Sequence, residues 1–164
     1  MKYLFSIFFI VFCNVVFAQH QKITQLLNKQ LQREYAKFYT DEEKANFSVT
    51  QDFYIDENKV LHFGFVLVIN DIGDKIHIER QVSLEKIVQF DKDQNVYFYT
   101  LNNDVIETQN DYDSNGKLTR TTTEYSNYFV TEINKEHHPN RFMKNVIKAF
   151  KKAGYAIECS YLKN

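Results

Sequence analysis

The sequence has few residues that break regular structure and few that cross-link it: four glycines, one proline and two cysteines. So little glycine and proline, in a chain that is 44% hydrophobic, argues against disorder. Cys13 lies in an N-terminal apolar segment that we expect to be removed, which leaves Cys159. A single cysteine forms no internal disulfide, so the hydrophobic core must hold the fold together.

The sequence also lacks an excess of either charge, since its formal net charge is −1. A net charge near zero argues against a nucleic-acid-binding protein, which normally carries a basic stripe. No nucleophile elbow, phosphate-binding loop, His-Glu-x-x-His motif or paired-cysteine zinc pattern occurs. Whether the chain is an enzyme stays open at this point, but no pattern calls for catalysis and we expect a non-catalytic protein.

The N-terminus has the organisation of a secretory signal peptide. Lys2 precedes an apolar run over residues 3–17, and the run ends in the small residue Ala18. The run is shorter than the roughly 20 residues that a membrane span needs, and Phe12 before Cys13 argues against lipoprotein processing. We expect residues 1–18 to be cleaved, residues 19–164 to form a single exported domain, periplasmic or secreted, and no stable membrane span to remain.

Hydrophobic periodicity predicts an α+β fold. Apolar residues at steps of three and four predict a helix over residues 20–39 and a second over about 140–153. Between them the period changes to two, which predicts an antiparallel meander of about six to eight strands, and residues 155–161 form a final strand. The expected strands of the meander cover residues 47–55, 60–69, 76–84, 88–90, 96–101, 105–112, 117–125 and 128–133. Residues 40–43 either end the first helix or cap a short second one.

A closed barrel is the alternative fold. The spacing of Leu84, Ile87 and Phe90 before Val96 and Phe98 resembles that of bacterial pleckstrin-homology-like barrels, which also place a helix after a meander. The resemblance covers a short stretch, implies no functional residue and does not account for the strand after the second helix.

His62 is the candidate ligand-binding residue. It lies among apolar residues of the predicted strand 60–69, and Gly64 beside it leaves room for a ligand or for a close backbone. In a hairpin with the next strand, His62 pairs near Val82, several residues from His77, so a shared metal is disfavoured. A hydrogen-bonded core histidine is the alternative interpretation.

One segment resembles a calcium loop. Asp111, Asp113 and Asn115, followed by Gly116, match the opening of such a loop. Thr122, however, stands at the twelfth position, where the loop needs a carboxylate, and the alternating flanks predict strands. We expect a hairpin turn and no cofactor, with calcium as the alternative.

The hairpin closed by this turn is polar on both strands. Residues 119–123 are threonines and one arginine, opposite the polar residues 107–110. Such a hairpin is either a solvated arm or an interaction surface, open to strand addition. Tyrosine suits interfaces because it is apolar with a polar tip. The candidate interaction surface comprises Tyr97, Tyr99, Tyr112 and Arg120.

These observations favour an exported binding or protein-interaction module, with a protein partner or a small ligand. Two alternatives remain. One is a periplasmic inhibitor or immunity-type protein, and the other is a ligand-pocket or hydrolase-like protein centred near His62.

Overall fold

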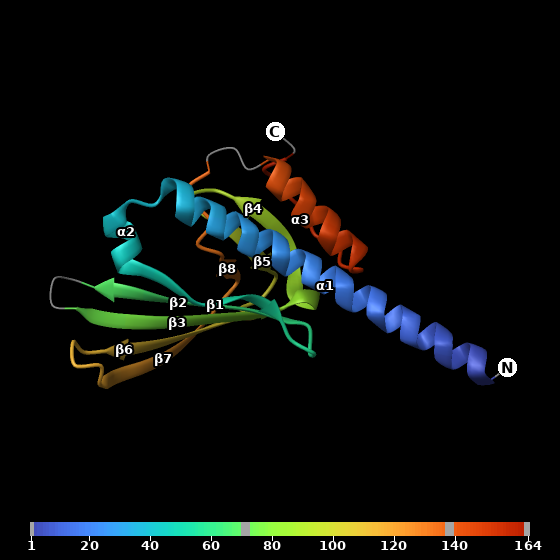
Figure 1. Ribbon diagram of the computed structural model, residues 1–164, viewed down its shortest axis with the longest axis horizontal. Coiled ribbons are helices and arrows are strands. Elements are labelled where there is room, and N and C mark those ends of the chain that lie inside the picture. The colour runs from blue at the N-terminus through green and yellow to red at the C-terminus, as the bar shows by residue number, and fades with distance from the viewer. Residues whose placement is uncertain (1, 70–72, 137–139, 163–164) are drawn as a thin grey trace.

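The computed structural model describes residues 2–69, 73–136 and 140–162, with side chains from residue 18 onward. The α-helices in these ranges are α1 (Lys2–Phe38), α2 (Asp41–Asn46) and α3 (Asn140–Lys152). α1 runs without a break through the predicted signal peptide and the predicted helix 20–39, and its N-terminal part projects beyond the rest of the chain (Figure 1). Cleavage after Ala18 stays a prediction, and Cys13 lies outside the described side chains. α2 is the short second helix, and a capping box begins it: Thr40 Oγ1 accepts from the Glu43 N–H at 3.2 Å.

The strands form two antiparallel sheets, so the predicted α+β class is confirmed. The five-stranded sheet has the order β1-β2-β3-β6-β7, and the three-stranded sheet has the order β4-β5-β8. A 3₁₀ turn, Leu84–Lys86, carries the chain from the first sheet to the second. The strands are β1 (Phe47–Ile55), β2 (Val60–Ile69), β3 (Asp74–Ser83), β4 (Ile87–Lys92), β5 (Val96–Thr100), β6 (Val105–Tyr112), β7 (Leu118–Ser126) and β8 (Tyr128–Val130).

Two expectations differ from the structure. The described strands close no barrel, so the pleckstrin-homology-like alternative is wrong: the two sheets share no ladder. The chain after α3 is extended but makes one parallel bridge, between Gln89 and Glu158. Beyond that bridge the backbone N–H groups of Ser160 and Tyr161 donate to the carboxylate of Asp91 instead of to a strand, at 3.3 and 2.9 Å.

The core lies between the helices and the two sheets. α1 and α3 lie side by side over it (Figure 1). α1 contributes Ile23, Leu27 and Leu31, all at most 2% exposed. Six of the twelve largest fully buried side chains are phenylalanines, which explains how a domain without a described disulfide obtains its packing. They are Phe63, Phe65, Phe90, Phe98, Phe129 and Phe150.

Polar side chains of α1 fix the helix to the strands. The side-chain amide of Asn28 donates to the Phe53 carbonyl at 2.9 Å and accepts from its N–H at 2.8 Å. The buried carboxylate of Glu34 accepts from the backbone N–H groups of Asn134 and Lys135, both at 2.8 Å. α1 is therefore held to the edge strand β1 and to the segment that follows β8.

Arg80 connects the two sheets from inside. It stands on β3 with its side chain 10% exposed, and it forms ion pairs with Glu107 at 2.5 Å and Glu132 at 2.6 Å. Its guanidinium also donates to the Val130 carbonyl of β8 at 2.9 Å and lies over the Phe65 ring, 4.9 Å from the centroid. The alternation of side chains along β3 places Arg80 on the core face of the sheet, and these partners compensate its buried charge.

Candidate functional site

His62 lies in a shallow hollow on the outer face of the five-stranded sheet. The hollow, of about 330 Å³, is lined by Gln51, Tyr54, His62, Glu79, Arg80, Gln81 and Thr108. The His62 ring stacks on Tyr54 with centroids 4.5 Å apart, and Nε2 lies 3.2 Å from Asp56 Oδ2. Gly64 leaves room for the backbone and not for a ligand, because a Cβ there would stand 3.1 Å from Gln51 Cβ of β1.

Asp56 gives His62 an ionised neighbour. Burial opposes ionisation of this carboxyl, but hydrogen bonds from the Val60 N–H and from His62 hold its pKa below the usual value. His62 pairs with Gln81, and His77 pairs with Val66, so both histidines face outward, several residues apart. The arrangement can hydrogen-bond a small polar ligand, and the role of His62 stays a prediction.

The four residues of the predicted interaction surface lie on three strands of two sheets, and their role in binding stays a prediction. Tyr97 and Tyr99 lie together on β5, 5.8 Å apart between ring centroids, and burial raises the pKa of Tyr99. Tyr112 stands on β6 of the other sheet, with its ring 4.7 Å from that of His77. Arg120 is exposed on β7. The structure thus places the tyrosine pair and Arg120 in different sheets.

The segment that resembles a calcium loop is a hairpin turn. Asp113 Oδ1 accepts from the backbone N–H groups of Asn115 at 3.0 Å and Lys117 at 2.9 Å, and Gly116 has a φ of 78°. Asp111 lies within β6, where its carboxylate accepts from Gln109 at 2.8 Å. The described residues contain no group of three His, Cys, Asp or Glu side chains that could hold a metal ion. Calcium binding stays a prediction.

A groove lined with cations runs between α1 and α3, and the sequence interpretation missed it. It consists of two adjoining cavities, of about 510 and 320 Å³, which share Leu26 and Asn145. The middle of α1, at residues 18–22, meets the last turns of α3, and residues 29–33 meet its first turn, so the helices are antiparallel (Figure 1). We call this feature the basic groove. Its cations are Lys22, Lys29 and Arg33 of α1 and Arg141, Lys148 and Lys152 of α3.

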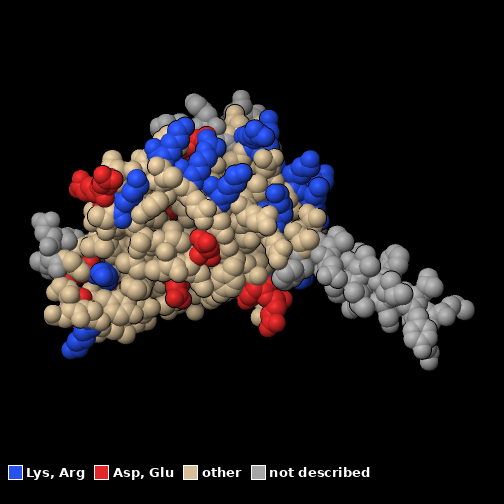
Figure 2. Space-filling view, viewed as in Figure 1, with Lys and Arg blue, Asp and Glu red and all other residues tan. Residues whose placement is uncertain are grey.

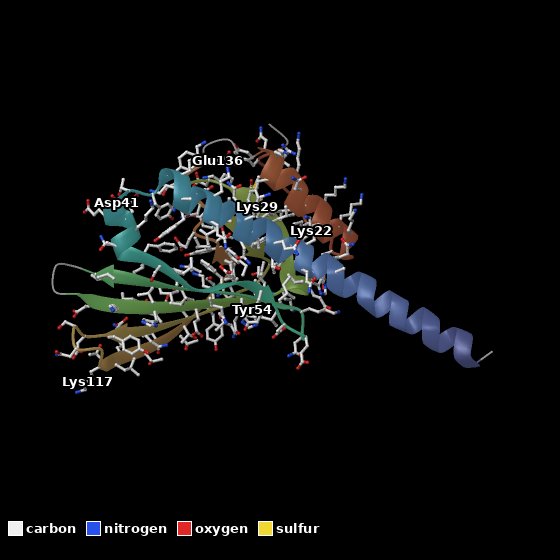
Figure 3. The ribbon with its side chains drawn as sticks, viewed as in Figure 1. Lys22, Lys29, Asp41, Tyr54, Lys117 and Glu136 are labelled. Atoms are coloured by element: carbon white, nitrogen blue, oxygen red, sulfur yellow. The ribbon has the colours of Figure 1, made fainter. Side chains whose placement is uncertain are left out.

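Helix geometry aligns these cations. Lys22, Lys29 and Arg33 are separated by seven and four residues, and the three cations of α3 repeat the same intervals. Seven and four residues are close to two turns and one turn of an α-helix, so each set lies along one face of its helix. Lys22 and Lys29 follow α1 on the side of α3 (Figure 3).

Most of the groove's charge is uncompensated. Of its six cations, only Arg33 forms an ion pair with another described residue. α3 carries five basic residues and no acidic one. On the face that Figure 2 shows, most Lys and Arg side chains gather over α1 and α3 with one acidic patch among them, and the other acidic side chains lie at α2 and along the sheet. The charges of the chain nearly cancel in sum, but they are unevenly distributed over this face.

The ion pair that exists indicates what the groove can hold. Glu136 reaches one end of it (Figure 3), where its carboxylate accepts from Arg33 Nη2 at 2.8 Å and from Gln30 Nε2 at 2.6 Å. A guanidinium and a side-chain amide together form a carboxylate-binding pair. The remaining cations extend this chemistry along the groove.

No helix within the described part of the chain is long and apolar enough to cross a membrane.

The geometry offers two candidate sites, the basic groove and the hollow beside His62. Comparison with protein families, with curated proteins and with solved structures finds no match for this chain.

Proposed function

We propose that the chain is an exported, non-catalytic protein-interaction module that binds an acidic polypeptide segment in the basic groove. The observation that carries the proposal is the alignment of six cations, five of them without an ion pair among the described residues, along one groove. Uncompensated like charges repel one another, and an anionic partner removes that cost.

The length of the groove supports a peptide ligand. On α1, in the exported chain, it runs from Gln19 to Arg33, which at 1.5 Å per residue is about 21 Å. An extended segment of about six or seven residues spans that distance. The cations are spread over the whole length, so a ligand with several negative charges in a row fits better than one with a single anion.

The chemistry of the floor and the end of the groove favours carboxylates on a polypeptide. Glu136 already occupies one end through Arg33 and Gln30. Leu26, which is partly exposed, lines the floor, so an apolar side chain of a peptide finds a contact between the cationic rims. A nucleic acid would need stacking platforms, but Phe142 is only 8% exposed and is packed in the core.

Fluorescence anisotropy of labelled deca-glutamate tests the proposal. The groove variant is Lys22→Glu/Lys29→Glu/Lys148→Glu, and the control is Lys75→Glu/Lys86→Glu/Lys117→Glu, which makes the same charge change at exposed positions outside the groove. Each exposed ion pair contributes about 0.5 kcal/mol. Three reversals remove three attractions and add three repulsions, about 3 kcal/mol, so we expect about a hundredfold weaker binding.

The control variant is expected to keep its affinity within about threefold, because most of its charges lie beyond the Debye length of about 8 Å at physiological salt. Equal losses in both variants, or no binding by the unaltered protein, contradict the proposal. If phosphatidylglycerol vesicles or a single-stranded oligonucleotide bind more tightly than deca-glutamate, the tighter binder gives the ligand class and the acidic polypeptide is wrong.

The hollow beside His62 supports a second candidate, a ligand-pocket protein. The observation in its favour is the contact between His62 and the ionised Asp56 at the rim of a hollow of about 330 Å³. A screen of small polar ligands by thermal shift tests it. A hit that His62→Ala abolishes supports this candidate, and a hit that the variant retains argues against it.

A further inference from the structure

β7 is an edge strand with one free side. It pairs with β6 and stands last in its sheet, so along its other side it has no strand partner in the described part of the chain. Seven of its nine residues are exposed. An edge of this kind offers a row of unpaired backbone donors and acceptors to another strand.

The two edges of the five-stranded sheet differ in protection. The pairing of β1 with β2 is interrupted by two register shifts, which distort that edge. β7 pairs with β6 without interruption from Arg120 to Ser126, and residues 118–126 contain no proline or lysine. The one register shift of β7 lies at its start, between Leu118 and Arg120, so residues 120–126 present a regular edge whose charges are Arg120 and Glu124.

The sequence of β7 is complementary to itself. In an antiparallel pair of two β7 strands centred on Thr122, Arg120 of each copy stands opposite Glu124 of the other. Thr121 then stands opposite Thr123. Opposite charges and threonine pairs in directly facing positions stabilise antiparallel strands.

In the isolated chain Arg120 faces Asp111 of β6, whereas Glu124 faces no cation. Glu124 stands opposite Glu107 in the β6–β7 ladder, and like charges in that position repel. Glu107 is bound to Arg80, whereas neither Glu124 nor Arg120 forms an ion pair with a described residue. Arg120 of a second copy would supply the cation that Glu124 lacks.

We propose that two copies of this chain associate through β7, in an antiparallel register centred on Thr122, to form a symmetric dimer with a continuous ten-stranded sheet. The symmetry makes each Arg120–Glu124 contact occur twice. The contact area of a single strand pair is small, so the dimer forms in a concentration-dependent manner at micromolar or higher concentrations.

Charge swaps tested by sedimentation velocity decide the matter. Arg120→Glu alone and Glu124→Arg alone each turn two attractions into two repulsions, so each is expected to raise the dimer dissociation constant about thirtyfold. The double variant Arg120→Glu/Glu124→Arg restores association to within about threefold. An equimolar mixture of the two single variants forms a heterodimer, because every facing pair then has opposite charges. Lys75→Glu, on β3, is the control and leaves the dissociation constant unchanged.

Circular dichroism confirms that each variant is folded. A protein that stays monomeric at all concentrations overturns the proposal, as does a dimer that the single swaps leave unchanged. Failure of the mixed single variants to associate, when the unaltered protein does, overturns the register centred on Thr122.

Discussion

Among the polar residues, Arg80 is the one whose replacement we expect to lower the free energy of unfolding most. Arg80→Met keeps the length of the side chain and removes its charge. It leaves the carboxylates of Glu107 and Glu132, 29% and 20% exposed, without their partner, and it removes the hydrogen bond to the Val130 carbonyl. The change also separates β3 from β8, because these contacts join the two sheets.

The magnitude follows from the burial. Removing one partner of a buried ion pair costs about 3–5 kcal/mol. The two carboxylates keep some access to water, which places the expected loss near the lower end, about 3 kcal/mol. With a urea m-value of about 2 kcal/mol per molar for a domain of this size, the unfolding midpoint should fall by about 1.5 M.

Urea unfolding followed by far-ultraviolet circular dichroism measures this loss, since the chain contains no tryptophan. Lys75→Met on the same strand is the control, and an exposed position of this kind should change stability by less than about 0.5 kcal/mol. Adding Glu107→Gln and Glu132→Gln to Arg80→Met should recover about 2 kcal/mol, because no unpaired charge then remains. A loss below about 1 kcal/mol for Arg80→Met would show that the ion pairs of Arg80 contribute little to stability.

Three further predictions concern the helix contacts and the turn. Asn28→Ala leaves the Phe53 N–H and carbonyl without partners and should cost about 2–3 kcal/mol in the same urea assay; a loss under about 0.5 kcal/mol would contradict it. Burial, together with the charge of Lys59, lowers the pKa of His20 below 6.5. The unfolded chain therefore binds the proton on His20 more readily than the folded chain does. The free energy of unfolding has its full value above the pKa of His20 in the unfolded chain and falls as the pH drops below it. His20→Gln should flatten the melting temperature between pH 7 and pH 5, and an unchanged slope argues against this origin. Calcium or chelator should leave the melting temperature unchanged, because Asp113 is occupied by the turn backbone; a calcium-dependent rise would show a metal site.

The local pattern of the sequence predicts the elements, because each one depends on neighbours in the chain. The helix 140–153 is observed as Asn140–Lys152, and the hairpin closed by residues 113–116 forms as expected. The sheet order depends on distant contacts that periodicity does not encode. The β4–β5 hairpin leaves the meander at the Leu84–Lys86 turn, so β3 pairs with β6. The pairing of His62 with Gln81, one residue from the expected Val82, likewise depends on a turn geometry that the sequence leaves open.

The basic groove could have been found from the sequence in part. The seven- and four-residue spacing of cations occurs in both helical segments and marks a charged face on each. The net charge of −1 averages over the whole chain and hides this separation. That the two faces lie side by side requires the packing of α1 against α3, and no local pattern predicts it.

Binding of an acidic polypeptide in the basic groove is tested at residue level by mapping amide chemical-shift changes as unlabelled deca-glutamate is titrated into isotopically labelled protein. We expect shifts concentrated in residues 19–33 of α1 and 141–152 of α3, with the largest near Lys29 and Lys148. Shifts concentrated on the sheets, or none at saturating peptide, would contradict it.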